Sequence, residues 1–433
     1  MAKELFVRIM DINEKGYGIA IVGNKVIEVP GALPNEYVHI KIGRKRRAKI
    51  IRFVERSPLR QAPVCAYYGL CGGCLWQDVK YDMQLRIKQG IVEKVFGFIK
   101  YDFQLEKIIP SRKIYWYRGK MEFIVGGESG SVVIGLRELG RYNRVVDIYS
   151  CWLQRPVANH VLQGFREKIS ILGYKPYNII THAGFLRYAV LRVSHHTDEC
   201  MVTIITSSKG KLDLSFIVDD LPVKTAVWAV SDSLADVAMG DIREVIGSGY
   251  IVENALGFNF KVPPFVFYQS NPEQAEILFD LAKRFGGSGD KALDLYCGIG
   301  TIAIIISENY GEVVGIEMDE DSVKVAYENA RVNDVKNVIF IKGKVEERIG
   351  GVRGKIDTVF VDPPRPGLSK TVVYSIGRLA PSIIIYVSCN PRSQARDILE
   401  LEKYGYRLEL LQPVDMLPHT PHIETIAVLS KQR

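Results

Sequence analysis

One cysteine, Cys389, follows the apolar run at residues 383–385 and stands just before Pro391. The apolar run predicts a buried strand and the proline ends it, so the thiol should lie in the loop at the strand's carboxyl edge. Open parallel α/β sheets bind ligands and perform chemistry at that edge. Cys389 is therefore our candidate for a catalytic nucleophile.

The predicted strand belongs to a series of five strand–turn–helix signals. Strands are expected at residues 292–296, 313–316, 338–341, 358–361 and 383–387. This alternation predicts a parallel, doubly wound sheet. Two carboxylates also fall at strand tips: Asp362 follows the fourth strand, and Glu424 precedes a final expected strand at 426–429.

A Gly-x-Gly turn at residues 298–300 follows the first strand, and Glu317 ends the second. Such a turn lets the backbone approach a nucleotide-like ligand, and the acid can bind two ribose hydroxyls. Ala303 meets the looser dinucleotide fingerprint, so spacing alone leaves NAD open. Asp294 beside the turn favours a cation over a pyrophosphate, which makes S-adenosylmethionine our preferred ligand. The alternative is a glycine turn kept for packing.

Three cysteines, Cys65, Cys71 and Cys74, are spaced so that their thiolates can face one centre, and Cys151 is the best candidate for a fourth ligand. The chain has seven cysteines, an odd number with one tight cluster. That pattern favours a metal site plus separate thiols over a disulfide framework. Spacing does not separate zinc from an iron–sulfur cluster, and zinc is favoured on general frequency. The alternative is a set of unligated core cysteines.

Residues 1–56 contain five short strand-like runs between glycine turns, which predicts a small closed barrel of the oligonucleotide-binding kind. A basic stripe that suits phosphates, or that protects an edge strand, comprises Lys41, Arg44, Lys45, Arg46, Arg47, Lys49 and Arg52. An amphipathic helix is predicted at residues 81–99, and the pattern at about 110–255 predicts a mixed α/β region. Aromatic and basic residues interleave at 115–118 and 141–144, which suits base stacking and equally a small domain's core and rim.

The 433 residues allow two or three domains, and 47% hydrophobic with 24% charged residues is ordinary for a soluble protein. No apolar run approaches the ~18 residues of a transmembrane helix. The chain starts without a signal-peptide core, so a cytoplasmic location is expected. The formal net charge of +8 permits a polyanionic partner.

Five motifs occur in order: Tyr-Gln-Ser-Asn at 268–271, Asp-Leu-Tyr-Cys-Gly-Ile-Gly-Thr at 294–301, Val-Asp-Pro-Pro-Arg-Pro-Gly-Leu at 361–368, Val-Ser-Cys-Asn-Pro at 387–391 and His-Thr-Pro-His-Ile-Glu-Thr at 419–425. Together they resemble the RNA uracil-C5 methyltransferases, which act on tRNA and large-subunit rRNA. The N-terminal region resembles that family's TRAM RNA-binding domain. The resemblance covers nearly the whole chain and is thinnest over 155–255.

The resemblance implies a class I, Rossmann-like methyltransferase domain at 256–433, a TRAM-like barrel at 1–56 and a central α/β iron–sulfur domain at 57–255. It implies that Cys389 is the nucleophile and Glu424 the base. The implied ligands of a [4Fe-4S] cluster, which replaces zinc as our expectation, are Cys65, Cys71, Cys74 and Cys151. The implied S-adenosylmethionine site comprises Gln269, Tyr296, Gly298, Gly300, Thr301, Glu317 and Asp362. Thr301 stands where some relatives have asparagine.

This chemistry suits the residues. Uracil C5 is a poor nucleophile, but addition of a thiolate to C6 makes C5 enolate-like, so that it can take a methyl group. A base then removes the C5 proton and the thiol leaves. Because a free cysteine with a pKa of ~8.5 is mostly protonated at neutral pH, we expect the site to lower this pKa, through Arg365 or Arg392. The target uracil must be flipped out of its stack, so a structured RNA loop is the expected partner.

Three alternatives stay open. RNA cytosine-C5 methyltransferases carry a second cysteine in the Asp-Pro-Pro-Arg region, whereas residues 363–366 here are Pro-Pro-Arg-Pro. A non-catalytic RNA-binding protein or chaperone would use barrel and charge alone. An iron–sulfur redox enzyme would need no methyl donor. The favoured hypothesis is a monomeric enzyme that binds tRNA or large-subunit rRNA and no membrane.

Overall fold

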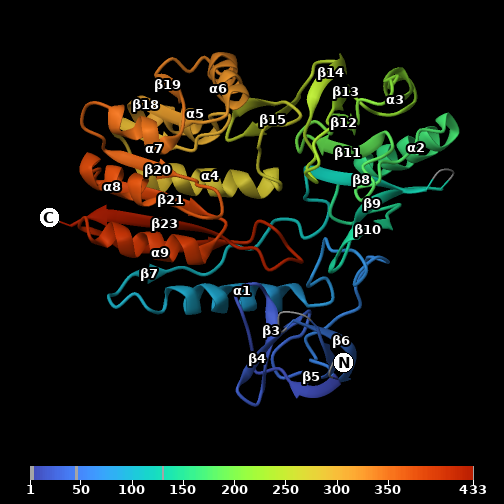
Figure 1. Ribbon diagram of the computed structural model, residues 1–433. Helices are drawn as coiled ribbons and strands as arrows, with labels where there is room; N and C mark the ends of the chain where they lie inside the picture. Colours follow the sequence, from blue (N-terminus) through green and yellow to red (C-terminus); the bar gives the residue numbers. More distant parts are fainter. Residues whose placement is uncertain (1–3, 44–46, 129–130, 433) are drawn as a thin grey trace.

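The computed structural model describes residues 4–43, 47–128 and 131–432. A small β-domain, a central sheet and a large C-terminal sheet follow one another along the chain (Figure 1). Arg44, Lys45 and Arg46 of the predicted basic stripe lie outside the described residues. Within the described ranges, no helix is both long and apolar enough to span a membrane.

The β-domain contains two three-stranded sheets, in the orders β1-β5-β6 and β2-β3-β4. A bridge between Glu28 and Arg47 connects the two sheets. Burial alternates along β3 and β5, because one face of each strand packs on a core that includes Ile9 and Ile40. The strands are β1 (Glu4–Arg8), β2 (Asp11–Ile12), β3 (Tyr17–Val22), β4 (Lys25–Pro30), β5 (Tyr37–Ile42) and β6 (Ala48–Glu55). The five predicted strands are present, the first of them divided into β1 and β2.

The central sheet has seven strands in the order β10-β9-β8-β11-β12-β13-β14, and only the pair β12–β13 is parallel. Its strands are β8 (Lys120–Glu128), β9 (Ser131–Glu138), β10 (Arg141–Asp147), β11 (Leu186–Val193), β12 (Cys200–Thr206), β13 (Thr225–Val230) and β14 (Asp241–Ile246). Two helices, α2 (Pro156–Leu172) and α3 (Ser215–Asp220), pack on one face. Apolar residues of β11 and β12 contribute to clusters on both faces, so these two strands are buried along their whole length.

The C-terminal sheet has eight strands in the order β19-β18-β17-β20-β21-β23-β22-β7. The five predicted strands are parallel, but β23 runs antiparallel to β21 and β22, so the sheet is mixed. The strands are β7 (Gln104–Leu105), β17 (Gly289–Leu295), β18 (Tyr310–Glu317), β19 (Val338–Lys342), β20 (Thr358–Val361), β21 (Ile383–Ser388), β22 (Tyr406–Val414) and β23 (Glu424–Lys431). Chain order reverses beside β17, which creates the crevice where such sheets bind ligands.

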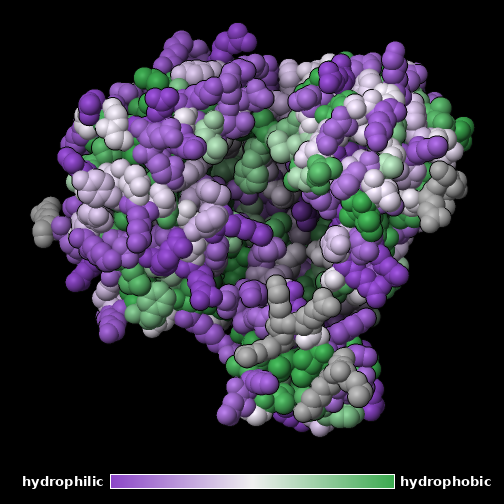
Figure 2. Space-filling model, in the orientation of Figure 1, coloured by the Kyte–Doolittle hydropathy of each residue, from purple (hydrophilic) through white to green (hydrophobic). Residues whose placement is uncertain are grey.

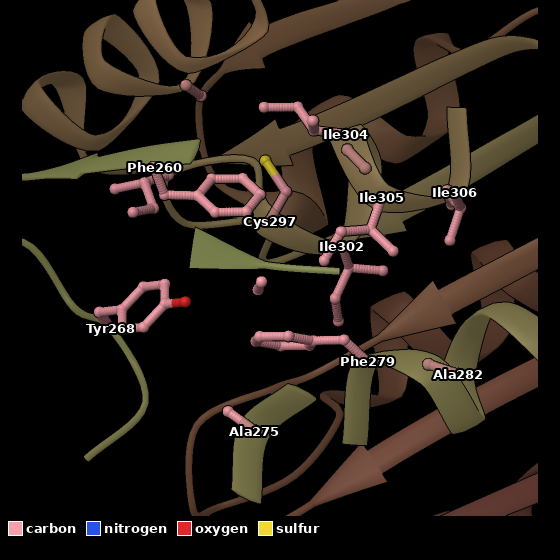
Figure 3. Close-up of a cluster of buried hydrophobic side chains, with 14 of the residues drawn as sticks. Phe260, Tyr268, Ala275, Phe279, Ala282, Cys297, Ile302, Ile304, Ile305 and Ile306 are labelled. Carbon is pink, nitrogen blue, oxygen red and sulfur yellow. The ribbon is translucent and has the colours of Figure 1, made fainter. Parts of the chain in front are cut away.

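Helices cover both faces of this sheet (Figure 1). One face packs on α4 (Pro272–Gly286), α5 (Thr301–Ile306), α6 (Glu320–Val332) and the hairpin of β15 (Ile251–Ala255) with β16 (Phe258–Val262). The other packs on α1 (Tyr81–Phe96), α7 (Val345–Arg348), α8 (Lys370–Leu379) and α9 (Pro391–Glu402). Figure 3 shows Cys297 among Phe260 and the isoleucines of α5, which makes this thiol a core residue, as predicted.

Candidate active site

The strand register brings Cys389 and Glu424 together. Ser388 at the end of β21 pairs with Thr425 near the start of β23. Cys389 and Glu424 occupy the next position on each strand, so they are neighbours at the edge of the sheet. Glu424 is 9% exposed and Cys389 is half-buried. A thiol and a carboxylate placed side by side can act as nucleophile and base on one small substrate.

A side chain of α9 fixes this pair of strand ends. Gln394 donates from Nε2 to the carbonyl of Tyr386 at 2.7 Å and to that of Thr425 at 3.3 Å. Its Oε1 accepts from the Thr425 hydroxyl at 2.7 Å. Gln394 is fully buried, so these bonds hold β21 and β23 in register where the thiol and the carboxylate emerge.

Hydrogen bonds tie the loop after β20 to the residues that follow the thiol. Asn390 Nδ2 and Ser393 Oγ both donate to the carbonyl of Arg365, at 3.0 and 3.1 Å. The guanidinium of Arg365 lies close enough to Cys389 for its charge to favour the thiolate. The other predicted cation, Arg392, lies elsewhere, because it donates to Glu14 of the β-domain at 2.9 Å.

The predicted decrease in the cysteine pKa is wrong for this structure. Burial raises the pKa of Cys389 to about 11, the charges of Glu424 and Asp362 add to this, and Arg365 opposes it. Burial also raises the pKa of Asp362 to about 7 and holds that of Glu424 well above its usual range. The site is thus a group of acids that repel one another when ionised.

The glycine turn after β17 lets a ligand approach the backbone closely. Gly298 and Gly300 have φ of 54° and 79°, and a Cβ on Gly300 would lie 2.6 Å from Phe340, so only glycine fits there. The Gly298 N–H donates to Glu317 Oε2 at 3.1 Å, which ties the first strand tip to the second. Burial raises the pKa of Asp294, and Asp362 and Glu317 add to it. Three carboxylates gathered in this way favour a cationic ligand.

A cavity of about 620 Å³ opens at the carboxyl edge of the sheet. The tips of β17, β18, β19 and β20 contribute lining residues to it: Tyr296, Met318, Lys344 and Pro364. Its volume is in the range of small-molecule sites. Tyr296 was predicted from the sequence and the other three were not. Each of the three follows a predicted strand, and Pro364 also stands in the motif at 361–368.

Of the seven predicted contact residues, only Tyr296 belongs to that lining. The six outside it are Gln269, Gly298, Gly300, Thr301, Glu317 and Asp362. Thr301 is buried as the first residue of α5. Gln269 is half-buried in the segment before α4, and its side chain makes no hydrogen bond to another described residue. Its neighbour Asn271 donates to the carbonyl of Met416 at 3.0 Å, which places this segment beside the loop that leads to Glu424.

The structure brings the four predicted cysteine ligands to one cavity: Cys65, Cys71, Cys74 and Cys151 line it together. Burial raises the pKa of Cys71 to about 11, and nearby Cys151 and Cys65 add to it. The Gly73 N–H and the Gln77 amide donate to the sulfurs of Cys71 and Cys74, at 3.3 and 3.9 Å. Across the described ranges, no three His, Cys, Asp or Glu side chains already form a metal-holding group. The donor set fits a thiolate-bound group.

Known proteins resemble this chain over its whole length. A family model described as tRNA (Uracil-5-)-methyltransferase matches residues 254–432. The tRNA (uracil(54)-C(5))-methyltransferase of Pyrococcus horikoshii is 34% identical over 97% of this chain and 98% of its own. The chain belongs to the RNA uracil-C5 methyltransferase family.

Two further relatives support the assignment of this methyltransferase to the family. An uncharacterized RNA methyltransferase of Caldanaerobacter subterraneus is 34% identical over 98% of each chain. The solved structure of Pyrococcus abyssi tRNA (uracil-54, C5)-methyltransferase in complex with S-adenosyl-L-homocysteine is 30% identical, with a TM-score of 0.82 over 98% of this chain and 100% of that one. This match confirms the predicted α/β methyltransferase fold.

A polar face of α1 holds the methyltransferase's loop ahead of Glu424. Tyr81 and Lys88 both bond Asp415, at 2.7 and 2.5 Å. Between them, Gln84 accepts from the His419 N–H at 2.8 Å. Lys88, Gln84, Asp415 and His419 are fully buried. Sequence analysis missed this contact, whose signal was a set of polar residues on the apolar face of a helix.

Lys88→Met should destabilise the methyltransferase by about 3–5 kcal/mol, because it leaves the Asp415 carboxylate buried without its partner. Lys94→Met, on the same helix, is the matched control. Lys94 pairs with Asp11 at the surface, so its loss should cost at most about 1 kcal/mol. Urea unfolding of both variants measures the two costs. Equal losses would show that the buried pair has no special role.

Alkylation of Cys389 should be slow at neutral pH in the free methyltransferase and rise about tenfold per pH unit toward pH 11, since only the thiolate reacts. Arg365→Gln should shift the profile to higher pH, because it removes the cation that opposes the increase in pKa. Arg392→Gln is the control and should leave the profile in place. Peptide-resolved mass spectrometry after iodoacetamide treatment measures the alkylation rate of Cys389 at each pH. A rate that reaches half its maximum near neutral pH would contradict the expected increase in the pKa of Cys389.

The β-domain touches the active edge of the sheet. Gly16, in the turn between β2 and β3, has φ of 72°, and a Cβ there would lie 2.5 Å from Pro421 and from Trp76. The Glu14–Arg392 pair adds a second contact. Figure 2 shows the surface hollowed where the β-domain, the central sheet and the C-terminal sheet meet. A large substrate can therefore contact all three parts at once.

Proposed function

We propose that this enzyme transfers the methyl group of S-adenosylmethionine to C5 of a uridine in tRNA. The register of β21 and β23 carries this proposal, because it sets Cys389 beside Glu424 at the edge that also holds the acidic glycine turn. The names of the Pyrococcus relatives specify uracil 54 of tRNA, and the P. abyssi structure holds the demethylated donor. Both support tRNA and S-adenosylmethionine as the substrates here.

Each step has a residue in place. Cys389 gives its thiol proton to solvent, Arg365 beside it stabilises the thiolate, and Sγ bonds to C6 of the uracil. The C5=C6 electron pair becomes an enolate, whose C5 takes the methyl group and releases S-adenosylhomocysteine. Glu424 removes the C5 proton, and the C–H electrons restore C5=C6 and expel the thiolate. A bound sulfonium donor would favour the ionised forms of Asp294 and Asp362, whose pKa values burial raises, and Glu317 lies beside them.

The β-domain is proposed as the TRAM-like RNA-binding part, residues 1–56. Its described basic residues include two that lie over aromatic rings: Arg47 over Tyr17 at 5.2 Å and Arg52 over Phe6 at 5.8 Å. Such pairs can contact phosphates while the rings accept bases. Cytosine-C5 methylation is less well supported, because residues 363–366 hold no second cysteine.

Incubation with methyl-labelled S-adenosylmethionine and unmodified tRNA or large-subunit rRNA, in separate reactions, tests the function. After digestion, label in 5-methyluridine from tRNA at one position supports the proposal. Label from rRNA alone would change the substrate, and label in 5-methylcytidine would change the reaction. The absence of label from both RNAs would favour a non-catalytic RNA-binding role.

We further propose that Cys65, Cys71, Cys74 and Cys151 hold a [4Fe-4S] cluster, since all four line one cavity. A bound cluster would supply bonds that tie the segment after β6 to the loop before α2, and no catalytic step. Reconstituted protein should contain iron and sulfide in equal amounts. Cys74→Ala should lose both, whereas Cys200→Ala, a buried thiol on β12, should keep them. Iron retained at the wild-type level by Cys74→Ala would refute this ligand set.

A further inference from the structure

Two tryptophans form an exposed stacked pair between the central sheet and the catalytic loop. The rings of Trp116 and Trp152 lie 5.6 Å apart at an angle of 20°. Trp116 is 45% exposed and Trp152 36%. The Trp116 N–H donates to the carbonyl of Trp152 at 2.9 Å, and the Arg118 N–H to that of Leu153. Two segments thus run side by side and fix the spacing of the rings.

The backbone of Trp116 is strained. Its φ of 53° lies in the left-handed region, which bulky residues rarely adopt. Strain of this kind persists where the surrounding structure imposes it, and it is concentrated at functional sites. Here it presents a large aromatic face to solvent, where hydrophobic burial alone would have placed the ring inside.

The pair connects with the active site through other rings. Tyr115 meets Trp152 edge-on at 5.8 Å and stacks on His419 at 4.6 Å. His419 lies five residues before Glu424, and its carbonyl accepts from the Leu75 and Trp76 N–H groups. The aromatic side chains therefore form a continuous strip from the surface to the loop that carries Glu424.

A cation accompanies this strip. Arg118 and Trp152 line the cavity that the four cysteines share. Burial lowers the pKa of His422 to about 4 and nearby Arg118 contributes, so this guanidinium also lies close to the catalytic loop. Within residues 4–43, 47–128 and 131–432, the Arg118 guanidinium donates from Nε to the Lys120 carbonyl at 3.2 Å and pairs with no carboxylate. An aromatic face beside a cation that lacks a carboxylate partner matches a base and its phosphate.

We propose that Trp116 and Trp152 stack an unpaired base of the RNA substrate, next to the uridine that is methylated. This inference rests on the proposed function for the choice of RNA. Extrusion of the target uracil breaks its stacking with its neighbours. The exposed tryptophan face offers a replacement surface, which lowers the cost of opening the loop and keeps the flanking nucleotide in place. Stacking of this kind tolerates any base, so the pair adds affinity with little sequence preference.

Trp116→Ala should weaken binding of an unmodified tRNA transcript about 5- to 150-fold, the range measured for the loss of one stacked base. KM should rise while kcat at saturating RNA stays within a few-fold. Trp116→Gly relieves the backbone strain and should weaken binding as much, which separates stacking from conformation. The control is Ile171→Ala, an apolar position on α2 that is more exposed than Trp116 and that should bind like wild type.

Fluorescence gives a second readout that a structural role would leave unchanged. RNA should quench the wild-type emission, because a stacked base contacts the exposed tryptophans. The double variant Trp116→Phe, Trp152→Phe keeps two rings and should bind within a few-fold of wild type without this quench. The remaining tryptophans, Trp76 and Trp228, serve as its background.

RNA binding and fluorescence quenching need no methyl donor. These measurements therefore test the stacking site separately from the proposed methyl transfer. Normal affinity and quenching in Trp116→Ala would overturn the stacking site while methyl transfer stands. A wild-type protein that binds and is quenched but never methylates would sustain the stacking site and overturn the proposed function. If Trp116→Ala loses thermal stability and Trp116→Phe fails to restore RNA affinity, the pair is only the rim of the cysteine cavity and the inference is wrong.

Discussion

Cys389→Ala should abolish methyl transfer to tRNA, with a fall in kcat of at least about 10⁴-fold, because Cys297, the other described thiol at this edge of the sheet, is buried. Removal of the nucleophile leaves uracil C5 unactivated, and nearby Cys297 cannot replace it from inside the core. Affinity for RNA and for S-adenosylhomocysteine should stay near wild type, since the half-buried thiol supports no packing cluster. Single-turnover assays with labelled donor, together with binding assays, measure both quantities.

Cys200→Ala is the matched control for that experiment. It removes a thiol from the central sheet and should leave kcat within a few-fold of wild type. A Cys389→Ala enzyme that retains a tenth of the wild-type rate would contradict covalent catalysis, whatever its RNA affinity.

Glu424→Gln should halt the reaction after methyl transfer and accumulate a covalent enzyme–RNA complex. The glutamine keeps the shape of the glutamate but cannot accept the C5 proton, so the thiolate is not expelled. Turnover should fall about 10²- to 10⁴-fold, the usual contribution of a general base. The stalled species should survive denaturation and carry one labelled methyl group per RNA.

The double variant Cys389→Ala, Glu424→Gln is the control for this trap and should form no complex. A Glu424→Gln enzyme that turns over without a trapped species would assign the proton to another group. The nearest described candidate is Asp362, whose pKa of about 7 suits proton transfer.

The parallel half of the C-terminal sheet could be predicted because apolar runs, glycine turns and strand-tip acids follow one another locally. Chemistry-bearing residues at the ends of those runs, such as Cys389 and Asp362, were therefore found from sequence. The antiparallel placement of β23 is set by pairing with β21, which no local pattern encodes. This antiparallel pairing also places Glu424 beside Cys389. The sequence motif therefore identified Glu424 but not its position relative to the thiol.

Long-range packing explains the remaining differences. Lys88 and Asp415 are 327 positions apart in sequence, and their contact follows from the docking of α1 on the C-terminal part. The pKa of Cys389 is raised by burial and by the neighbouring carboxylates of Glu424 and Asp362. From the sequence, only the nearby arginines could be recognised as neighbours of the thiol. Arg365 and Arg392 looked equivalent in sequence, and the hydrogen bonds of the Arg365 carbonyl distinguish them.

The most direct test of the mechanism uses tRNA with 5-fluorouridine at the target position. Fluorine cannot be removed by a base, so the enzyme, donor and this RNA should form a methylated adduct that persists. Peptide mass spectrometry should then locate the nucleotide on the sulfur of Cys389, with methyl and fluorine both on C5. A cross-link at any other residue, or complete conversion without an adduct, would contradict attack by Cys389 on the uracil ring.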